Sequence, residues 1–374
     1  MTALSFRGVG LALALGAALV AGCGSDRPPP TPLENFTPTL AGREVWNTRI
    51  GKIGFPMRPT VRDDSFFVAS EDGTVMALRA DTGATLWRTD IGARIAAGVG
   101  SDGRFTSVVT RGNEVVVLDS GREAWRKTMP SSVVTPPLVA GERVFVMSVD
   151  RAVHAFDAVD GRRLWVYQRP GDALTLAQAS VVTAFKDTLL VAQGARLTAI
   201  DPLAGNVRWD AQLATPRGTN EVERLADLLG PVVRAGDRVC ARAFQSAVGC
   251  ADAARGALLW SRNTGGVQAI GGNAERLFGA DAVDRITAWR TDNGDVSWTS
   301  EKLLYRGLSG PVAVGTVVVF GDAQGYVHFL NASNGEPQLR LATDGSAVIG
   351  SPVLSGTTML VVTAGGGLHA FRPN

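Results

Sequence analysis

The sequence predicts an all-β protein, an eight-bladed β-propeller of four-stranded blades whose ring is closed by the N-terminal strand joining the C-terminal blade. A Gly-x-x-x-Trp spacing recurs along the chain, and successive glycines lie 38 to 51 residues apart, a range typical of propeller repeats. Strand and turn signals fill each period, without an amphipathic helix. The eight copies start at Gly42, Gly83, Gly121, Gly161, Gly205, Gly256, Gly294 and Gly335, and the last has Leu339 in place of the tryptophan.

Each period is expected to hold four strands. A proline-containing start, such as Gly310-Pro311-Val312, suits the first residue of a strand, where a missing N–H is tolerated. Two further runs follow, and the second ends in a polar turn whose glycine, as at Gly83, supplies a positive φ before the last strand. Six tryptophans recur with this turn and are expected to be buried between blades: Trp87, Trp125, Trp165, Trp209, Trp260 and Trp298.

Ring closure is predicted from the two ends of residues 41–374, the expected propeller. The last repeat supplies three strands, near Val353, 360–362 and 368–371, and no final tryptophan strand. The first copy, Gly42 to Trp46, is a final strand with no blade before it. Joining the two completes one blade and leaves few exposed strand edges.

Composition argues against a polyanionic partner. The chain has 45% hydrophobic and 19% charged residues and a formal net charge of +2. It contains no basic cluster, so we expect no nucleic-acid binding. The 44 glycines are periodic, so they mark turns.

The N-terminal residues are expected to direct export and anchoring. Residues 1–22 combine Arg7 with a short apolar run, which is typical of a signal peptide and too short for a membrane span. The junction Leu19-Val20-Ala21-Gly22-Cys23 resembles a bacterial lipobox, which predicts lipidation of Cys23; the alternative is an ordinary signal peptide that contains a cysteine. Residues 23–40 are rich in proline and are expected to form a flexible, lipidated tether.

The repeat spacing is stretched in two consecutive steps. One step is lengthened around 169–176 and the next around 215–227. Extra length in a repeat array usually maps to loops on a binding face. The alternative is a surface insertion without function.

The sequence contains no recognisable catalytic or metal-binding pattern. His154, His328 and His369 occupy one repeated slot in three different blades, which indicates a structural role and predicts no metal site. The sequence has no nucleophile elbow and no phosphate-binding glycine-rich turn. We therefore expect no catalytic residues and no cofactor.

Two cysteines remain after Cys23. Cys240 and Cys250 lie on neighbouring strands of one predicted hairpin, and in an exported protein such a pair is a disulfide candidate. The bond requires a bulged turn or one longer than two residues. Alternatively, Cys250 fills the small-residue slot held elsewhere by Ala77 and Ala155.

The repeated Ala-Leu-x-Ala-x-x-Gly-x-x-x-Trp pattern resembles the quinoprotein (PQQ-like) propeller repeat over residues 42–374. Combined with the lipobox, the tether and eight blades, the chain resembles the BamB family, propeller lipoproteins of the outer-membrane β-barrel assembly machinery. Three phrases carry this resemblance: Glu34-Asn35-Phe36-Thr37-Pro38, Glu223-Arg224-Leu225-Ala226-Asp227 and 321–328.

The resemblance implies a non-enzymatic scaffold at the periplasmic face of the outer membrane. In that family two adjacent loops meet the POTRA repeats of BamA, and they correspond to the two stretched steps. The implied contact residues are Leu174, Leu176, Arg224 and Asp227, apolar anchors with a polar rim. Ala177 and Leu229 depart from the motifs, which have an arginine and an acid there. The implied partners are BamA, through it the other Bam subunits, and unfolded outer-membrane proteins whose folding and insertion it supports.

Two other functions use the same blades. One is a PQQ-dependent periplasmic dehydrogenase, which has a vicinal cysteine pair, whereas Cys240 and Cys250 are ten residues apart. The other is a periplasmic propeller that binds a small ligand in its central channel. Buried, convergent polar groups in that channel would favour the ligand binder.

Overall fold

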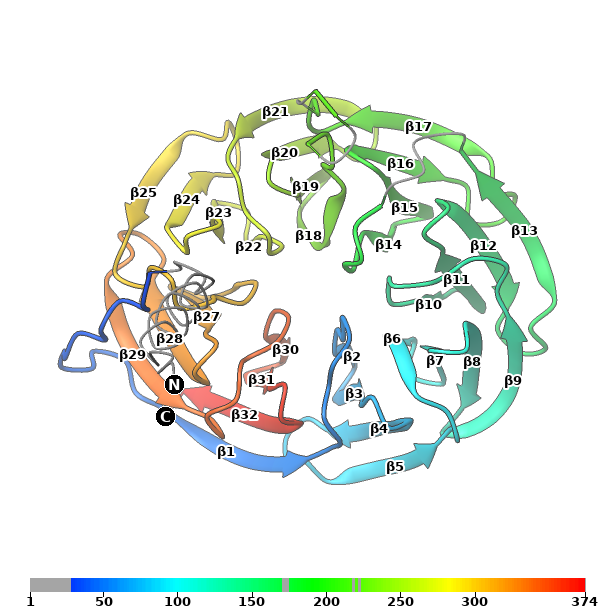
Figure 1. The fold of residues 1–374 in the computed structure, drawn as a ribbon, viewed down its shortest axis with the longest axis horizontal. Helices are drawn as coiled ribbons and strands as arrows, with labels where there is room; N and C mark the ends of the chain where they lie inside the picture. The colour runs from blue at the N-terminus through cyan, green and yellow to red at the C-terminus, as the bar shows by residue number, and fades with distance from the viewer. Residues whose placement is uncertain (1–27, 170–174, 217–218, 221–222, 374) are drawn as a thin grey trace, which may run out of the picture.

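A computed structural model describes residues 28–169, 175–216, 219–220 and 223–373. Eight four-stranded antiparallel sheets surround a central axis like the blades of a propeller (Figure 1). The predicted fold class and blade count are confirmed. No helix within the described ranges is long and apolar enough to cross a membrane.

The first four blades follow one another in chain order, with the first strand of each innermost. Blade 1 comprises β2 (Thr60–Arg62), β3 (Ser65–Ala69), β4 (Thr74–Arg79) and β5 (Thr85–Asp90). Blade 2 comprises β6 (Ile95–Ser101), β7 (Phe105–Thr110), β8 (Glu114–Asp119) and β9 (Arg122–Thr128). Blade 3 comprises β10 (Leu138–Ala140), β11 (Arg143–Met147), β12 (Ala152–Asp157) and β13 (Arg163–Gln168). Blade 4 comprises β14 (Val182–Phe185), β15 (Thr188–Gln193), β16 (Arg196–Ile200) and β17 (Val207–Gln212).

The next three blades repeat this order, and the eighth draws on both ends of the propeller. Blade 5 comprises β18 (Leu228–Ala235), β19 (Arg238–Ala243), β20 (Ala247–Asp252) and β21 (Ala257–Asn263). Blade 6 comprises β22 (Gly271–Gly272), β23 (Arg276–Ala280), β24 (Ile286–Arg290) and β25 (Val296–Ser300). Blade 7 comprises β26 (Val312–Val314), β27 (Val317–Gly321), β28 (Tyr326–Asn331) and β29 (Pro337–Ala342). Blade 8 comprises β30 (Val353–Ser355), β31 (Thr358–Val362), β32 (Gly367–Pro373) and β1 (Gly42–Arg49).

The ring closes in the eighth blade as the sequence predicts. β1 pairs antiparallel with β32, from Gly42 opposite Pro373 to Arg49 opposite Gly367. The sheet order β30-β31-β32-β1 therefore joins strands from both ends of the propeller (Figure 1). Closure in this way leaves no blade with a missing outer strand.

A β-bulge recurs beside the tryptophan in the outermost strand. In blade 1, Ala77 pairs with Trp87 while Leu78 pairs with Thr85, so Leu86 is the extra residue. A bulge re-aims the side chains around it, and Leu86 is accordingly 46% exposed. The same shift appears in the other blades.

The tryptophans join neighbouring blades through the turn glycines. A Cβ built on Gly161 of blade 3 would lie 2.6 Å from the indole of Trp125 in blade 2, and Gly161 has a φ of +69°. Glycine is thus required for both backbone conformation and space. The same contact recurs around the ring, and where the tryptophan is lost, Leu339 lies against Gly42.

Six indoles also donate a hydrogen bond across the junction. Trp125 Nε1, for example, donates to Ala158 O at 2.9 Å, and the others are Trp46, Trp165, Trp209, Trp260 and Trp298. The predicted burial holds for Trp125 and Trp260, which are 8% and 7% exposed. The prediction overstates the burial of four other tryptophans, which are half-buried because they lie on the outermost strands: Trp87, Trp165, Trp209 and Trp298.

The hydrophobic core consists of layers between adjacent blades. One layer joins Phe185, Leu190 and Leu197 of blade 4 to Val239 and Ala241 of blade 5. Another joins Leu360 and Leu368 of blade 8 to residues of blade 1. Strands that are apolar on both faces are expected when sheets stack on either side.

Part of the segment expected to be a tether is hydrogen-bonded to the propeller from Thr31 onward. Thr31 N donates to Leu304 O at 3.0 Å, and Thr39 N donates to Gln338 O at 3.0 Å. The guanidinium carbon of Arg340 lies 5.2 Å from the centroid of the Phe36 ring. These contacts fix a proline-rich chain that has no core of its own.

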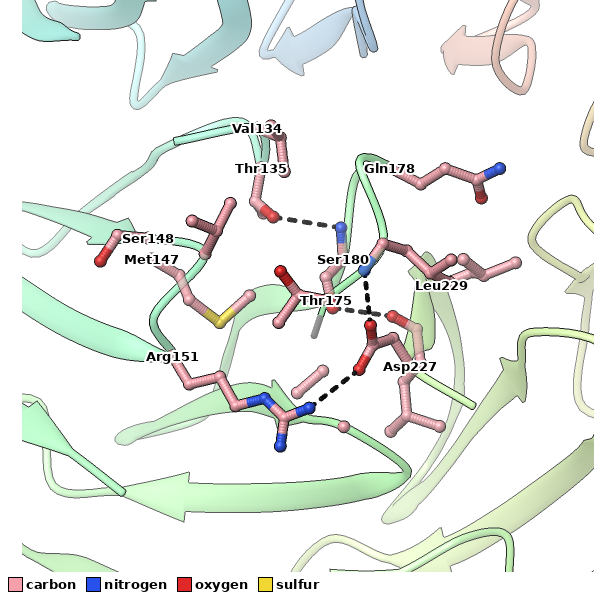
Figure 2. Close-up of a pocket in the computed structure, with 15 residues that line it drawn as sticks. Val134, Thr135, Met147, Ser148, Arg151, Thr175, Gln178, Ser180, Asp227 and Leu229 are labelled. Carbon is pink, nitrogen blue, oxygen red and sulfur yellow. Dashed lines mark hydrogen bonds and ion pairs between the residues drawn. The ribbon is translucent and has the colours of Figure 1, made fainter. Parts of the chain in front are cut away.

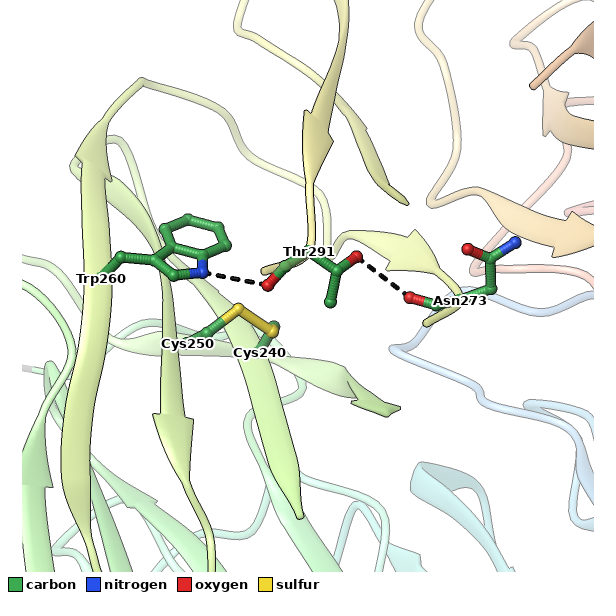
Figure 3. Close-up of a disulfide and its surroundings, with 5 residues drawn as sticks. All are labelled: Cys240, Cys250, Trp260, Asn273 and Thr291. Carbon is green, nitrogen blue, oxygen red and sulfur yellow. Dashed lines mark hydrogen bonds between the residues drawn. A yellow bond between two sulfur atoms is a disulfide. The ribbon is translucent and has the colours of Figure 1, made fainter. Parts of the chain in front are cut away.

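The two remaining cysteines form a disulfide between β19 and β20 (Figure 3). Cys240 stands directly opposite Cys250 with the Cα atoms 4.0 Å apart. A three-residue turn, 244–246, connects the strands, which places both side chains on the same face. Cys250 also pairs in register with Trp260, so it occupies the small-residue slot as well.

The three histidines are buried in three separate blades. His328 Nε2 lies 2.9 Å from Asp322 Oδ2, which also accepts a hydrogen bond from Arg306 Nε at 2.8 Å. Burial opposes the ionisation of Asp322, but hydrogen bonds from His328 and the Tyr326 N–H hold the pKa of its carboxyl below the ordinary value. Arg306 in turn donates to Thr31 O, so this cluster secures the N-terminal segment.

The stability of the propeller should fall as the pH drops below about 6.5. Burial lowers the pKa of His154 and of His328 from 6.5, the latter despite its hydrogen bond to Asp322. As the pH falls, each histidine is therefore protonated in the unfolded chain before it is protonated in the folded chain. The stability that each neutral, buried histidine gives the fold is complete above pH 6.5 and is lost progressively below it. Each histidine can contribute up to about 1.4 kcal/mol per pH unit to this loss.

Urea unfolding at pH 7.5 and pH 5.5 measures this effect. His154→Met introduces the residue that fills the equivalent slot in blade 1, Met76, and should reduce the acid-induced loss. An acid-induced loss as large in the variant as in the wild type would contradict this assignment.

Candidate partner-binding site

The two stretched connections lead into neighbouring blades. One runs over 169–181 between β13 and β14, and the other over 213–227 between β17 and β18. The structure describes 169 and 175–181 of the first and 213–216, 219–220 and 223–227 of the second. Both precede an innermost strand, so they lie at the same end of adjacent blades, and the sequence-based expectation that they are neighbours is met by direct contacts.

Asp227 joins the two connections (Figure 2). Its Oδ2 accepts a hydrogen bond from the backbone N–H of Leu176 at 2.8 Å. Its Oδ1 lies 3.7 Å from Arg151 Nη2, and its own carbonyl accepts from Phe244 N at 3.0 Å. Asp227 is only 8% exposed, so its carboxylate binds neighbouring protein groups and does not face solvent.

Further hydrogen bonds hold the same two segments together. Ser180 Oγ donates to Leu228 O at 2.7 Å, and Gly230 N donates to Ala179 O at 3.2 Å. Ser180 N donates to Thr135 Oγ1 of the connection into blade 3 at 3.2 Å. The lead-ins to blades 3, 4 and 5 therefore form one continuous surface.

Arg151 belongs to this site although sequence reasoning missed it. It lies in the turn between β11 and β12 with a φ of 63°, and its guanidinium packs against Gly194 of blade 4. Gln193 Nε2 donates to its carbonyl at 3.1 Å. An Asp-Arg turn between strands is ordinary in a repeat protein, so no sequence signal distinguished it.

Arg224 and Glu223 form the exposed part of the second connection. Both side chains are exposed, and Asn220 Oδ1 accepts a hydrogen bond from Glu223 N at 2.9 Å. Hydrogen bonds from the backbone and hydroxyl of Thr219 hold the pKa of Glu223 below its ordinary value. This surface therefore presents two adjacent side chains of opposite charge.

The predicted contact residues separate into different environments. Arg224 is exposed, and Leu176 is half-buried beside a cavity of about 30 Å³ between the loops. Asp227 is buried and lies beside Arg151, so its carboxylate holds the two loops together. Leu174 and Cys23 lie outside the described residues.

The described ranges hold no cluster of three or more His, Cys, Asp or Glu side chains that could bind a metal ion. The features that they do contain define a class: a closed, eight-bladed propeller of quinoprotein-type repeats with a polar loop surface between three blades. The family model described as "Outer membrane protein assembly factor BamB" matches residues 38–88 and 71–300. The chain belongs to this family.

Relatives and solved structures agree with this assignment. Outer membrane protein assembly factor BamB of Burkholderia pseudomallei is 35% identical over 370 residues, which cover 97% of each chain. The crystal structure of BamB from Moraxella catarrhalis has a TM-score of 0.80 at 22% identity and covers 88% of this chain and 99% of that one. Quinohemoprotein alcohol dehydrogenase from Comamonas testosteroni has a TM-score of 0.68 at 15% identity, and the match covers 89% of this chain and 76% of that one. At these identities the two structures show the fold alone.

Proposed function

We propose that this chain is a non-enzymatic scaffold lipoprotein of outer-membrane protein assembly that binds the POTRA region of BamA. The observation that carries the proposal is the surface formed by 175–180 and 223–229, in which Asp227 fixes two loops of neighbouring blades. A preorganised loop surface reduces the entropy lost on binding a partner. Membership in a family described as an assembly factor supports the same role.

The proposed anchor is Cys23 at the periplasmic face of the outer membrane. Cys23 lies eight positions before Thr31, which is hydrogen-bonded to the connection into blade 7, and an extended chain of that length reaches at most about 29 Å. Blade 7 would then lie next to the membrane. The surface between blades 3, 4 and 5 lies elsewhere on the ring (Figure 1), which leaves it open to a partner.

Arg224→Glu should weaken binding to the immobilised POTRA region of BamA by about tenfold, or about 1.4 kcal/mol. The substitution reverses an exposed charge that orients the encounter, so the effect should diminish at high salt. Adding Leu174→Asp to Arg224→Ala should abolish capture, because the predicted apolar anchor is also lost.

Arg43→Glu is the matched control, since it reverses one exposed charge on β1, far from the loops. Both single variants should melt like the wild type. Equal POTRA affinity of Arg224→Glu and wild type, with normal melting, would move the interface elsewhere on the propeller.

Cys23→Ser should release the protein from outer membranes. The serine variant would lack the acyl chains, and stable anchoring needs two lipid signals. Membrane fractionation followed by a salt wash measures the effect. A Ser variant that still sediments with the outer membrane after washing would show that another element provides the anchor.

A further inference from the structure

The centre of the ring contains two adjoining cavities. One, of about 560 Å³, is lined by the innermost strands of all eight blades. The other, of about 310 Å³, is lined by the segments that lead into those strands in blades 1, 4, 5, 6, 7 and 8. Both volumes fall near the range of small-molecule sites. Three residues line both cavities: Arg58, Pro231 and Ser351.

Arg58 extends across the channel between these cavities. Its backbone is fixed to blade 2, because Arg58 N donates to Gly98 O at 2.9 Å and Val99 N donates to Arg58 O at 3.1 Å. Its Nη1 lies 3.3 Å from the position that a Cβ would take on Gly230. Gly230 belongs to blade 5, which faces blade 1 across the ring. The guanidinium therefore reaches across the channel to the lining of blade 5.

The described lining of both cavities is positive, with three arginines and no carboxylate. Arg62 Nε donates to Ser101 O at 3.0 Å and Arg234 Nη1 donates to Ala184 O at 2.7 Å, and both side chains are exposed. Arg58 has no hydrogen-bond or ion-pair partner for its guanidinium within the described residues. Burial is the cause that lowers the pKa of Arg58, yet an arginine stays protonated at neutral pH.

Two buried arginines elsewhere in the chain, Arg242 and Arg306, have protein acceptors, although Nε and Nη2 of Arg242 have none among the described residues. Arg242 donates to the carbonyls of Gly265, at 3.0 Å, and Ala280. Arg306 donates to Asp322. Arg58 is half-buried and lines both cavities, so its guanidinium is placed to pair with an anionic ligand that enters the channel.

We propose that the central channel binds a small organic or inorganic oxyanion, a carboxylate or a phosphate, on the guanidinium of Arg58. A planar guanidinium holds either group through two parallel hydrogen bonds, and the proline-lined walls around it hold the rest of a compact ligand. Gln178 and Leu229 line both the smaller cavity and the cavity between the partner loops. The bound anion would therefore lie directly behind the proposed partner surface, although the site does not depend on that function.

Calorimetric titration of the purified, full-length lipoprotein in detergent tests the site. The probes are sodium phosphate and sodium succinate, each measured against sodium chloride at equal ionic strength. At least one probe should bind the wild type, and Arg58→Gln should weaken that binding at least tenfold. Arg234→Gln, which removes an exposed arginine of the same channel, should change the affinity less than threefold.

Melting in anion-poor buffer separates a binding role from a structural one. Arg58→Gln should melt at or above the wild-type temperature, because it removes a cation that lacks a partner. Arg58→Lys keeps the charge but lacks the planar guanidinium. It should fold like the wild type and should bind the anion at least threefold more weakly. If Arg58→Gln does not fold, the lysine variant tests whether Arg58 binds the anion. Failure of both probes to bind the wild type, or unchanged binding by the lysine variant, would overturn the proposal.

Discussion

Replacing Trp125 by alanine should lower the free energy of unfolding by about 3–5 kcal/mol. The indole is 8% exposed, lies against Gly161 of the next blade and donates to Ala158 O at 2.9 Å. Its removal leaves a cavity between blades 2 and 3, and the turn glycine cannot fill it. Urea unfolding followed by circular dichroism measures the loss.

Trp125→Leu is the matched control, because Leu339 occupies the equivalent position between blades 7 and 8. Leucine keeps much of the apolar contact but loses the hydrogen bond, which is worth about 1 kcal/mol. The leucine variant should therefore be clearly more stable than the alanine variant. A melting temperature of Trp125→Ala equal to that of the wild type would show that this junction does not stabilise the ring.

Asp227→Ala should destabilise the propeller by about 2–3 kcal/mol and weaken POTRA binding at least tenfold. The substitution removes the acceptor of the Leu176 N–H and the carboxylate beside Arg151. The two loops would then lose their fixed relative position, and the partner would bear the entropic cost of ordering them. Unfolding and binding measurements on one preparation report both effects.

Asp237→Ala provides the comparison within the same blade. Asp237 pairs with Lys186 at 2.6 Å, but both side chains are more than half exposed, and such pairs contribute about 0–1 kcal/mol. Stability and binding should stay near wild type in this variant. If Asp227→Ala bound POTRA with wild-type affinity, the loop pair would not be the partner surface, even if the variant were less stable.

The repeat pattern by itself determined the architecture. A glycine that must adopt positive φ and a tryptophan four residues later recur together, because each indole packs on the turn glycine of the next blade. A contact made once per blade leaves a periodic trace in the sequence. The number of blades and the closure through β1 and β32 therefore followed from the spacing alone.

Contacts made only once left no such trace, and only the tertiary structure decided them. Asp227 meets Arg151 across two blades, Thr31 docks on blade 7, and Arg58 reaches Gly230 across the channel. Each pair is distant in the chain and belongs to no repeated slot. The sequence identified the two long loops as a candidate site, but which of their side chains face a partner and which hold the loops together depends on how three blades pack.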